Sequence, residues 1–390
     1  MGVSHPEGRG PMFWKTTRTP VLRSLTAPEE VKADARAAFE IAAEKLEALT
    51  TGHPDLLVLS TEGGKWVEAT WTDWSQGFLG GQLWLVFEQT GEERWQELAR
   101  HYSNLVYDRQ WDDRTHNLGL LIATTHKQAW ELTSDAAGWR ASIQAGRSLA
   151  SRFDRTGRFL VTDDRPSATA INVMVNTPLV MWTGLETSDS ELIDIARQHS
   201  ATTRRFLVRG DGSTAHTADF DHLTGEYLRA ATARGWRSDG TWSRGLALSI
   251  YGFTSLYALD ANPDWLEVAC LNARHWMRET TRRGDLVPPN DLAEPTPSQP
   301  WDSSSAAVVS GALFHLAQYL PDEDEARRVN EHALATFQRL ASPEFLARQA
   351  GWEGVLKHAV LNERIGLGVD ESMALADYFF LEAARDIRAS

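Results

Sequence analysis

Helical periodicity is the feature that most constrains how this chain can fold. Apolar residues recur at three- and four-residue spacing over most of its length, which is the pattern of amphipathic helices that bury one face. The clearest stretches are residues 31–49, 80–106, 138–153, 190–207, 255–279, 325–340 and 374–387. The pattern therefore favours an all-α fold.

Short turns connect these stretches in pairs. The turns read QTGEERW, LTSDAAGW, ETSDSEL, LDANPDW and YLPDEDEA, and each offers acids or Ser/Thr suited to capping the next helix. An apolar helix, a turn and an amphipathic helix recur every 40 to 70 residues or so, roughly the spacing of a repeated supersecondary unit. About six such hairpins predict a closed double ring, with apolar helices inside and charged helices outside.

The loops between the helical hairpins predict little further regular structure. Residues 213–227, STAHTADFDHLTGEY, alternate like strands around a turn and predict a short β-hairpin. The Pro-rich segment 285–305 has helical repeats on both sides, so we expect a loop over one face and not a domain linker. We expect residues 1–30 to form an N-terminal extension and residues 31–390 a single catalytic-type domain.

Charge and composition exclude several classes of partner. The net charge is −14, and no run of Lys and Arg supplies the basic patch of a nucleic-acid-binding protein. We find no signal-peptide h-region and no run of about 18 apolar residues, so we expect no membrane partner. The single cysteine, Cys270, allows no disulfide within the chain. We expect a cytoplasmic protein, and its oligomeric state stays open.

A series of distinctive sequence blocks lies between about residues 30 and 385. The blocks are WTDWSQGFLGGQLWLVFEQTGEERW, INVMVNTPLVMW, RGDGSTAHTADFDHLTGE, SDGTWSRGLALSIYGF, WDSSSAAVVSGAL and GVLKHAVLNERIGLGVDESMALADYFFLEAA. In sequence and in order, these blocks resemble the unsaturated glucuronyl hydrolases of glycoside hydrolase family 88. The resemblance implies an (α/α)6 barrel with an active-site cleft at one end.

The resemblance also implies a substrate and a reaction. The family acts on oligosaccharides that carry a 4,5-unsaturated uronic acid at the non-reducing end. An acid protonates C4 of the enol ether, water adds at C5, the hemiketal opens and the remaining sugar leaves. This chemistry needs a group that gives and takes a proton near neutral pH.

Two positions depart from the family pattern. The family has one aspartate in H-D-L-G-F and a second in I-D-x-x-x-N-x-P-L, and Asn117 and Asn172 occupy these positions here. A carboxamide keeps the size and hydrogen bonding of a carboxylate, but it cannot act as a general acid or base. Other positions also differ from the family: T-H-Q-G reads TARG at residues 232–235, and R-G-Q-A-W reads RGLAL at 244–248.

The candidate site residues follow from these blocks. The candidate catalytic residues are Asn117, Asn172, His116 and His216. The candidate substrate-binding residues are Trp74, Trp242, Arg244, Arg234 and Ser303. Indole rings stack on the apolar face of a sugar, and the forked guanidinium of Arg244 suits a carboxylate. Arg234 would add positive charge for an anionic substrate. The alternative is that the tryptophans pack in the hydrophobic core and that the histidines have only structural roles.

Three functions remain open on sequence alone. The first is an enzyme of the family type with a relocated acid, for which Asp73, Asp112, Asp113, Asp163, Asp164, Asp239 and Asp302 are candidates. The second is a uronate lyase, in which an amide neutralises the carboxylate and a His or Tyr removes the C5 proton. The third is a carbohydrate-binding protein without catalysis. We expect no cofactor and no metal, because HExxH, CxxC and EF-hand patterns are missing from the sequence.

Overall fold

The computed structural model describes residues 22–68, 74–162, 165, 167–296 and 299–390. Asp73, Asp163 and Asp164, which were candidate acids, lie outside these residues. Within the described part, no helix combines the length and the apolar character that a membrane span requires.

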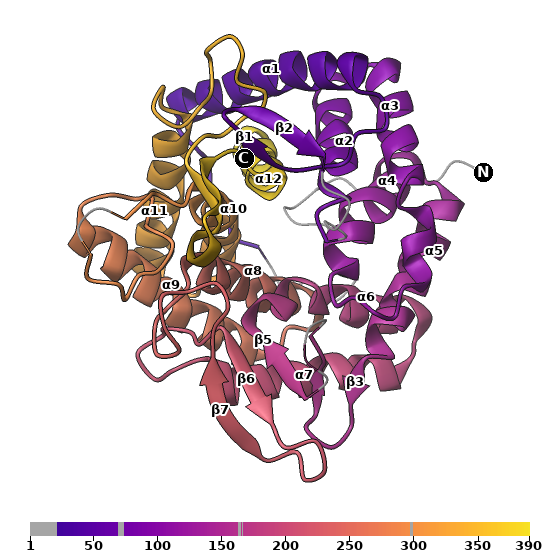
Figure 1. Cartoon of the computed structure of the whole chain (residues 1–390), viewed down its shortest axis with the longest axis vertical. Coiled ribbons are helices and arrows are strands. Elements are labelled where there is room, and N and C mark those ends of the chain that lie inside the picture. The colour runs from indigo at the N-terminus through magenta and orange to yellow at the C-terminus, as the bar shows by residue number, and fades with distance from the viewer. Residues whose placement is uncertain (1–21, 69–73, 163–164, 166, 297–298) are drawn as a thin grey trace.

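The predicted (α/α)6 barrel is confirmed, and helices surround a common centre in Figure 1. The outer helices are α1 (Glu29–Gly52), α3 (Glu93–Asn104), α5 (Ala136–Ala150), α7 (Ser190–Leu207), α9 (Pro263–Arg283) and α11 (Glu323–Ala341). The inner ring contains α2 (Phe78–Thr90), a π-helix η2 (Gly119–Lys127) continued by α4 (Gln128–Thr133), a 3-10 helix η3 (Ile171–Val175) followed by α6 (Thr177–Thr187), α8 (Ser243–Asp260), α10 (Ser303–Tyr319) and α12 (Ala374–Ala389). Each inner element packs against the next, and α12 closes the ring onto α2.

Burial explains which helices lie inside. Every residue of α10 is buried, whereas α7 buries a stripe and leaves its charged residues outside. The predicted capping turns are confirmed at four outer helices, where a side chain accepts a hydrogen bond from a backbone N–H of the first turn. The capping residues are Asp135, Asp189, Asn262 and Asp322.

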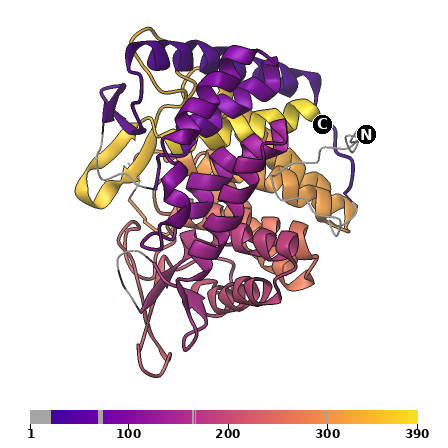
Figure 2. The same cartoon turned by 90° about the vertical axis from the view of Figure 1, so that its right-hand side faces the viewer.

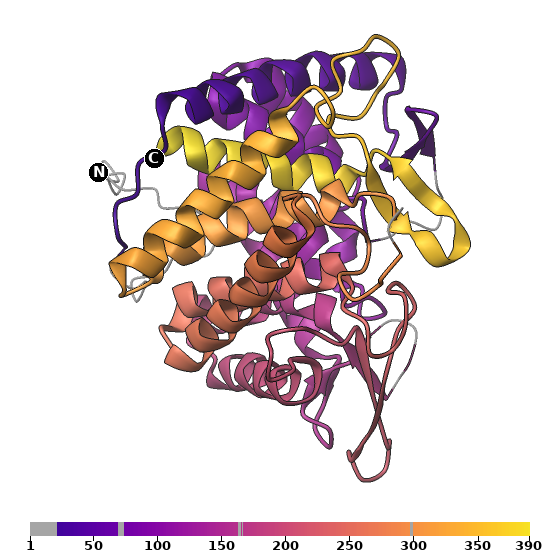
Figure 3. The same ribbon diagram turned by 90° about the vertical axis from the view of Figure 1, so that its left-hand side faces the viewer.

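Short strands gather at one end of the barrel (Figures 2 and 3). The predicted hairpin is confirmed as β6 (Thr217–Phe220) and β7 (Tyr227–Ala231), and β5 (Ala168–Ala170) adds a third strand to it. Further antiparallel pairs join β1 (Val58–Glu62) to β2 (Lys65–Glu68), β3 (Phe153–Asp154) to β4 (Phe159–Leu160) and β8 (Ala359–Asn362) to β9 (Leu367–Glu371). Two short 3-10 helices, η1 (Tyr107–Trp111) and η4 (Glu363–Ile365), complete the described elements.

Polar side chains of α8, α10 and α12 are buried within the barrel. The hydroxyls of Tyr251 and Tyr378 donate to Oε1 of Glu382 at 3.4 and 3.3 Å, and His315 lies 2.9 Å from Asp386. Burial raises the pKa of Glu382 to about 8. The folded protein therefore holds a proton on Glu382 at a pH where the unfolded chain has lost it.

Glu382 should make the protein less stable as the pH rises. An unfolded glutamate ionises near pH 4.3, whereas folded Glu382 keeps its proton until about pH 8. The stabilising contribution is complete below the unfolded pKa, and about 1.4 kcal/mol is lost per pH unit up to the folded pKa. We expect Glu382→Gln to flatten the decline in free energy of unfolding between pH 6 and pH 8, as measured by urea denaturation. An equally steep decline in the variant would contradict this.

Candidate active site

The candidate residues lie around the end of the barrel where the inner helices begin. Trp74 precedes α2, His116 and Asn117 precede η2, and Asn172 lies in η3. Trp242, Arg244 and Ser303 lie at the starts of α8 and α10. Helix N-termini carry partial positive charge from their free N–H groups, which favours an anionic ligand.

His116 and Asn172 form the central contact of this site. Nδ2 of Asn172 lies 3.0 Å from Nε2 of His116, although the two residues are 56 positions apart in the sequence. His116 is buried and Asn172 half-buried, so little water screens the contact. A carboxamide offers a donor and an acceptor, so it can hydrogen-bond the imidazole in either protonation state by rotating its amide group.

Asn117 is held by its own turn. Its backbone N–H and its Nδ2 both donate to Oγ1 of Thr115 at 3.2 Å. The turn is joined to the second asparagine block because the N–H of Leu120 donates to Oδ1 of Asn176 at 2.9 Å. The structure therefore brings both asparagine blocks to one place.

Gly119 permits this close approach. A Cβ at this position would lie 2.7 Å from Cα of Asn176 and 2.8 Å from its Oδ1, which is closer than side chains normally pack. We expect Gly119→Ala to destabilise the protein by about 1–3 kcal/mol, because neighbouring backbone must move. Thermal unfolding measures the effect, and Gly52→Ala is the control because a Cβ there meets nothing within 4 Å. Equal melting temperatures for the two variants would contradict the packing argument.

His216 is fixed as a neutral imidazole. Burial, followed by the positive charges of Arg234, Arg165 and Arg244, lowers the pKa of His216 to about 3. Its Nδ1 accepts the backbone N–H of Ala233 at 3.1 Å, so the remaining proton belongs on Nε2. Among the described residues Nε2 has no recorded hydrogen-bond partner, and it can donate to a ligand.

The arginines beside His216 differ in how they are held. Arg165 pairs with Asp219 at 2.6 Å and donates to Thr217 at 2.8 Å. Nη1 of Arg234 donates weakly to the carbonyl of Leu361 at 3.4 Å. Sequence reasoning missed Arg165, because its position before a proline carries no signal that the β5–β6 pairing brings it to the site.

Arg244 is engaged with the scaffold. Its guanidinium donates to Oγ of Ser304 and to the carbonyls of Val360 and Leu361 at 2.8, 2.5 and 2.9 Å. Asp302 lies 3.6 Å away and caps α10 through the N–H of Ser304. Ser303 is fully buried, and its Oγ has no hydrogen-bond partner within the described ranges.

The two tryptophans are held differently. Trp242 is buried against His216, with ring centroids 4.8 Å apart, and the Arg244 guanidinium lies 4.9 Å from its ring. Trp74 is half-buried and packs edge-on against Phe78. Trp74 therefore keeps exposed ring surface, whereas Trp242 mainly supports the imidazole of His216.

The described candidate acids are occupied elsewhere. Asp112 is paired with Arg109 and Arg114, Asp113 is exposed, and Asp239 pairs with Arg237 at the surface. Burial raises the pKa of Asp302, whose Oδ1 accepts hydrogen bonds from the backbone N–H groups of Ser304 and Val360.

The described residues contain no cluster of potential metal ligands. Among the described residues, no group of three or more His, Cys, Asp or Glu side chains is placed to hold a metal ion.

Comparison with known proteins gives consistent relatives. No protein-family model matches the chain. The unsaturated glucuronyl hydrolase of Bacillus sp. (strain GL1) is 30% identical over 337 residues, covering 83% of this chain and 89% of that protein. An Asp-to-Asn variant of unsaturated glucuronyl hydrolase, solved with dGlcA-Glc-Rha-Glc, has a TM-score of 0.84 at 30% identity over 90% of this chain and 95% of that one. An unsaturated glucuronyl hydrolase specific for heparin has a TM-score of 0.85 at 25% identity, covering 92% and 97%.

Proposed function

The chain belongs to the unsaturated glucuronyl hydrolases of glycoside hydrolase family 88, and from this we propose that it hydrates the 4,5-double bond of unsaturated uronyl oligosaccharides. The proposal assigns proton transfer to His116, supported by Asn172, in place of the family's aspartates. The observation that carries it is the 3.0 Å contact between Nε2 of His116 and the Asn172 amide.

An imidazole suits the chemistry of this reaction. Histidine side chains generally titrate between pH 5 and 8, which matches the need for one group to give and then take a proton. Protonated His116 would deliver its proton to C4, leaving an oxocarbenium at C5. Water then adds its oxygen to C5 and returns one proton to His116, so one water molecule is added in total. The resulting hemiketal opens and releases the second sugar.

Asn172 suits an imidazole that changes its protonation state. Its amide donates to neutral Nε2 and, once rotated, accepts from protonated Nε2–H. A relative that carries asparagine in place of an aspartate was solved with a uronyl oligosaccharide. That structure supports the proposal that amides are compatible with substrate binding.

We assign the uronate carboxylate to the part of the site around His216. His216 offers a neutral N–H, while Arg165, Arg234 and buried Arg244 contribute positive charge around it. An N–H donor surrounded by cations binds a carboxylate without a proton being transferred. We assign carboxylate binding to His216 and Arg234. Arg244 contributes its positive charge, and it keeps β8 in place by donating hydrogen bonds to two β8 carbonyls. Trp74 supplies an exposed ring on which a sugar can stack.

The absorbance of the conjugated double bond tests the reaction class. The natural protein is incubated separately with an unsaturated uronyl disaccharide and with an intact uronyl oligosaccharide. Hydration predicts that absorbance disappears with the first and stays constant with the second. A rise with the intact oligosaccharide would instead establish β-elimination, and binding without any change would establish a non-catalytic protein.

A further inference from the structure

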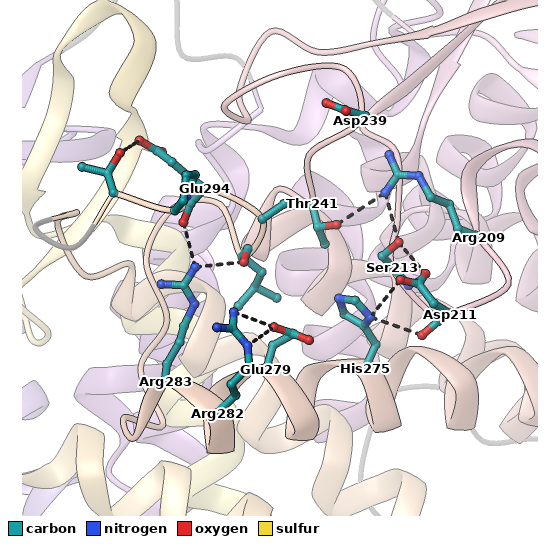
Figure 4. A pocket seen from close by; sticks show the side chains of 14 residues that line it. Arg209, Asp211, Ser213, Asp239, Thr241, His275, Glu279, Arg282, Arg283 and Glu294 are labelled. Carbon is teal, nitrogen blue, oxygen red and sulfur yellow. Dashed lines mark hydrogen bonds and ion pairs between the residues drawn. The ribbon is translucent and has the colours of Figure 1, made fainter.

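A second polar cavity lies outside the candidate active site. Its volume is about 580 Å³, within the range of small-molecule sites. One face of α9 lines it with His275, Glu279, Arg282 and Arg283, and two loops supply the other walls (Figure 4). None of the candidate catalytic or substrate-binding residues lines this cavity; of the candidate acids, Asp239 does.

Charged groups around the cavity are largely paired with each other or with the backbone. Arg282 bonds Glu279 at 2.9 Å, and Arg283 donates to the carbonyls of Leu292 and Glu294 at 2.9 and 3.0 Å. Arg209 donates to the carbonyl of Gly240 at 3.0 Å. The lining contains three arginines and four carboxylates, so it presents no excess of positive charge.

The lining nevertheless keeps both hydrogen-bond donors and hydrogen-bond acceptors that are not fully used. Nη1 of Arg282 and Nη1 of Arg283 have no recorded partner among the described residues, and they can donate. The carboxylate oxygens of Asp211 and Glu279 keep lone pairs that can accept further bonds. Hydroxyl groups donate and accept at once, so a ligand with several hydroxyls suits this lining. A carboxylate or phosphate offers acceptors alone, so it would leave the acceptors of Asp211 and Glu279 unused, and the three arginines of the lining do not outnumber its four carboxylates.

The cavity shares a wall with the active site. The N–H of Leu292 donates to the carbonyl of Thr241 at 2.9 Å, and Thr241 lines the cavity next to Trp242. Asp291 holds this wall by accepting the N–H groups of Trp236 and Thr241, both at 2.9 Å. A ligand in the cavity would contact the segment that carries Trp242.

We propose that this cavity is a second binding site for a neutral sugar unit. The unit is either a free sugar or the uncharged distant part of a uronyl oligosaccharide. A monosaccharide of this kind should bind with a Kd on the order of 1 mM, because small polar ligands bind with modest energy per atom.

Calorimetric titration tests the proposal without requiring catalysis. Methyl β-glucoside is the neutral probe, and glucuronate is the charged comparison. Ala293→Trp places a large side chain on an exposed position of the cavity wall, and Ala136→Trp is the control on an exposed position of α5. We expect the glucoside to bind the natural protein and Ala136→Trp, and to bind Ala293→Trp at least tenfold more weakly. Absence of saturable binding to the natural protein, or equal binding to Ala293→Trp, would overturn the proposal.

The KM values for a disaccharide and a tetrasaccharide separate the two sources, and this comparison rests on the proposed function. If the oligosaccharide itself fills the cavity, Ala293→Trp raises the KM for the tetrasaccharide alone. If a free sugar fills it, both KM values stay the same while binding of the glucoside is lost. Failure of the proposed function would remove turnover of both substrates but leave the titration unaffected.

Discussion

Replacing His116 with glutamine is expected to lower kcat on an unsaturated uronyl disaccharide by about 10²–10⁴-fold, the usual contribution of a positioned acid or base. Glutamine retains a side-chain amide that can hydrogen-bond Asn172, so the site should keep its shape. The KM should change by less than about threefold, because a group that acts in the transition state contributes little to ground-state binding. Steady-state assays that follow the double bond separate the two constants.

The control for this variant is His222→Gln, which changes an exposed histidine in the β6–β7 turn. Its kcat should equal that of the natural protein. If His116→Gln retained kcat within a factor of about three, His116 could not be the proton-transfer group, since such groups contribute at least about a hundredfold. A rise in KM at constant kcat would instead assign His116 to substrate binding.

Replacing Asn172 with aspartate is expected to move the pH profile of kcat toward higher pH. A carboxylate 3.0 Å from Nε2 would favour the protonated imidazole, and an opposite charge at this distance shifts a pKa by roughly 1–3 units. The proton donor should therefore persist to higher pH. The alkaline limb of kcat against pH should therefore move upward by about one to three units.

Asn262→Asp is the matched control for this second variant. Asn262 caps α9 by accepting the N–H of Asp264, and aspartate caps a helix equally well. This control adds the same charge far from His116 in the fold and should leave the limb in place. A limb that stays fixed in Asn172→Asp while kcat rises would show that the introduced carboxyl itself transfers the proton.

Repeating patterns made the fold predictable from sequence. The 3.6-residue periodicity of 190–207 matches the bounds of α7, and the turn acids Asp135 and Asp189 cap the expected helices. The pairs β1–β2 and β8–β9 were missed because four successive residues are buried in β1 and in β8, so neither strand alternates, and β3–β4 was missed because strands of two residues are too short to alternate. The π-helical form of η2 was missed because helix periodicity does not specify hydrogen-bond spacing.

The site was predictable in part. The resemblance identified the blocks of His116, Asn172 and His216, but the contact between His116 and Asn172 depends on how two inner elements pack. The bonds that occupy Arg244 also come from β8, more than a hundred residues away in the chain. Such contacts depend on tertiary packing, which local sequence patterns do not encode.

Product analysis by NMR in D₂O shows whether His116 delivers a proton to C4 of the substrate. The natural protein, with asparagine at both positions, is incubated with an unsaturated uronyl disaccharide, and His116→Gln is treated in parallel. We expect the natural protein to consume the double bond and place one deuteron at C4, while the variant leaves most of the substrate intact over the same time. An unchanged disaccharide with the natural protein, or equal deuteration by both proteins, would contradict it.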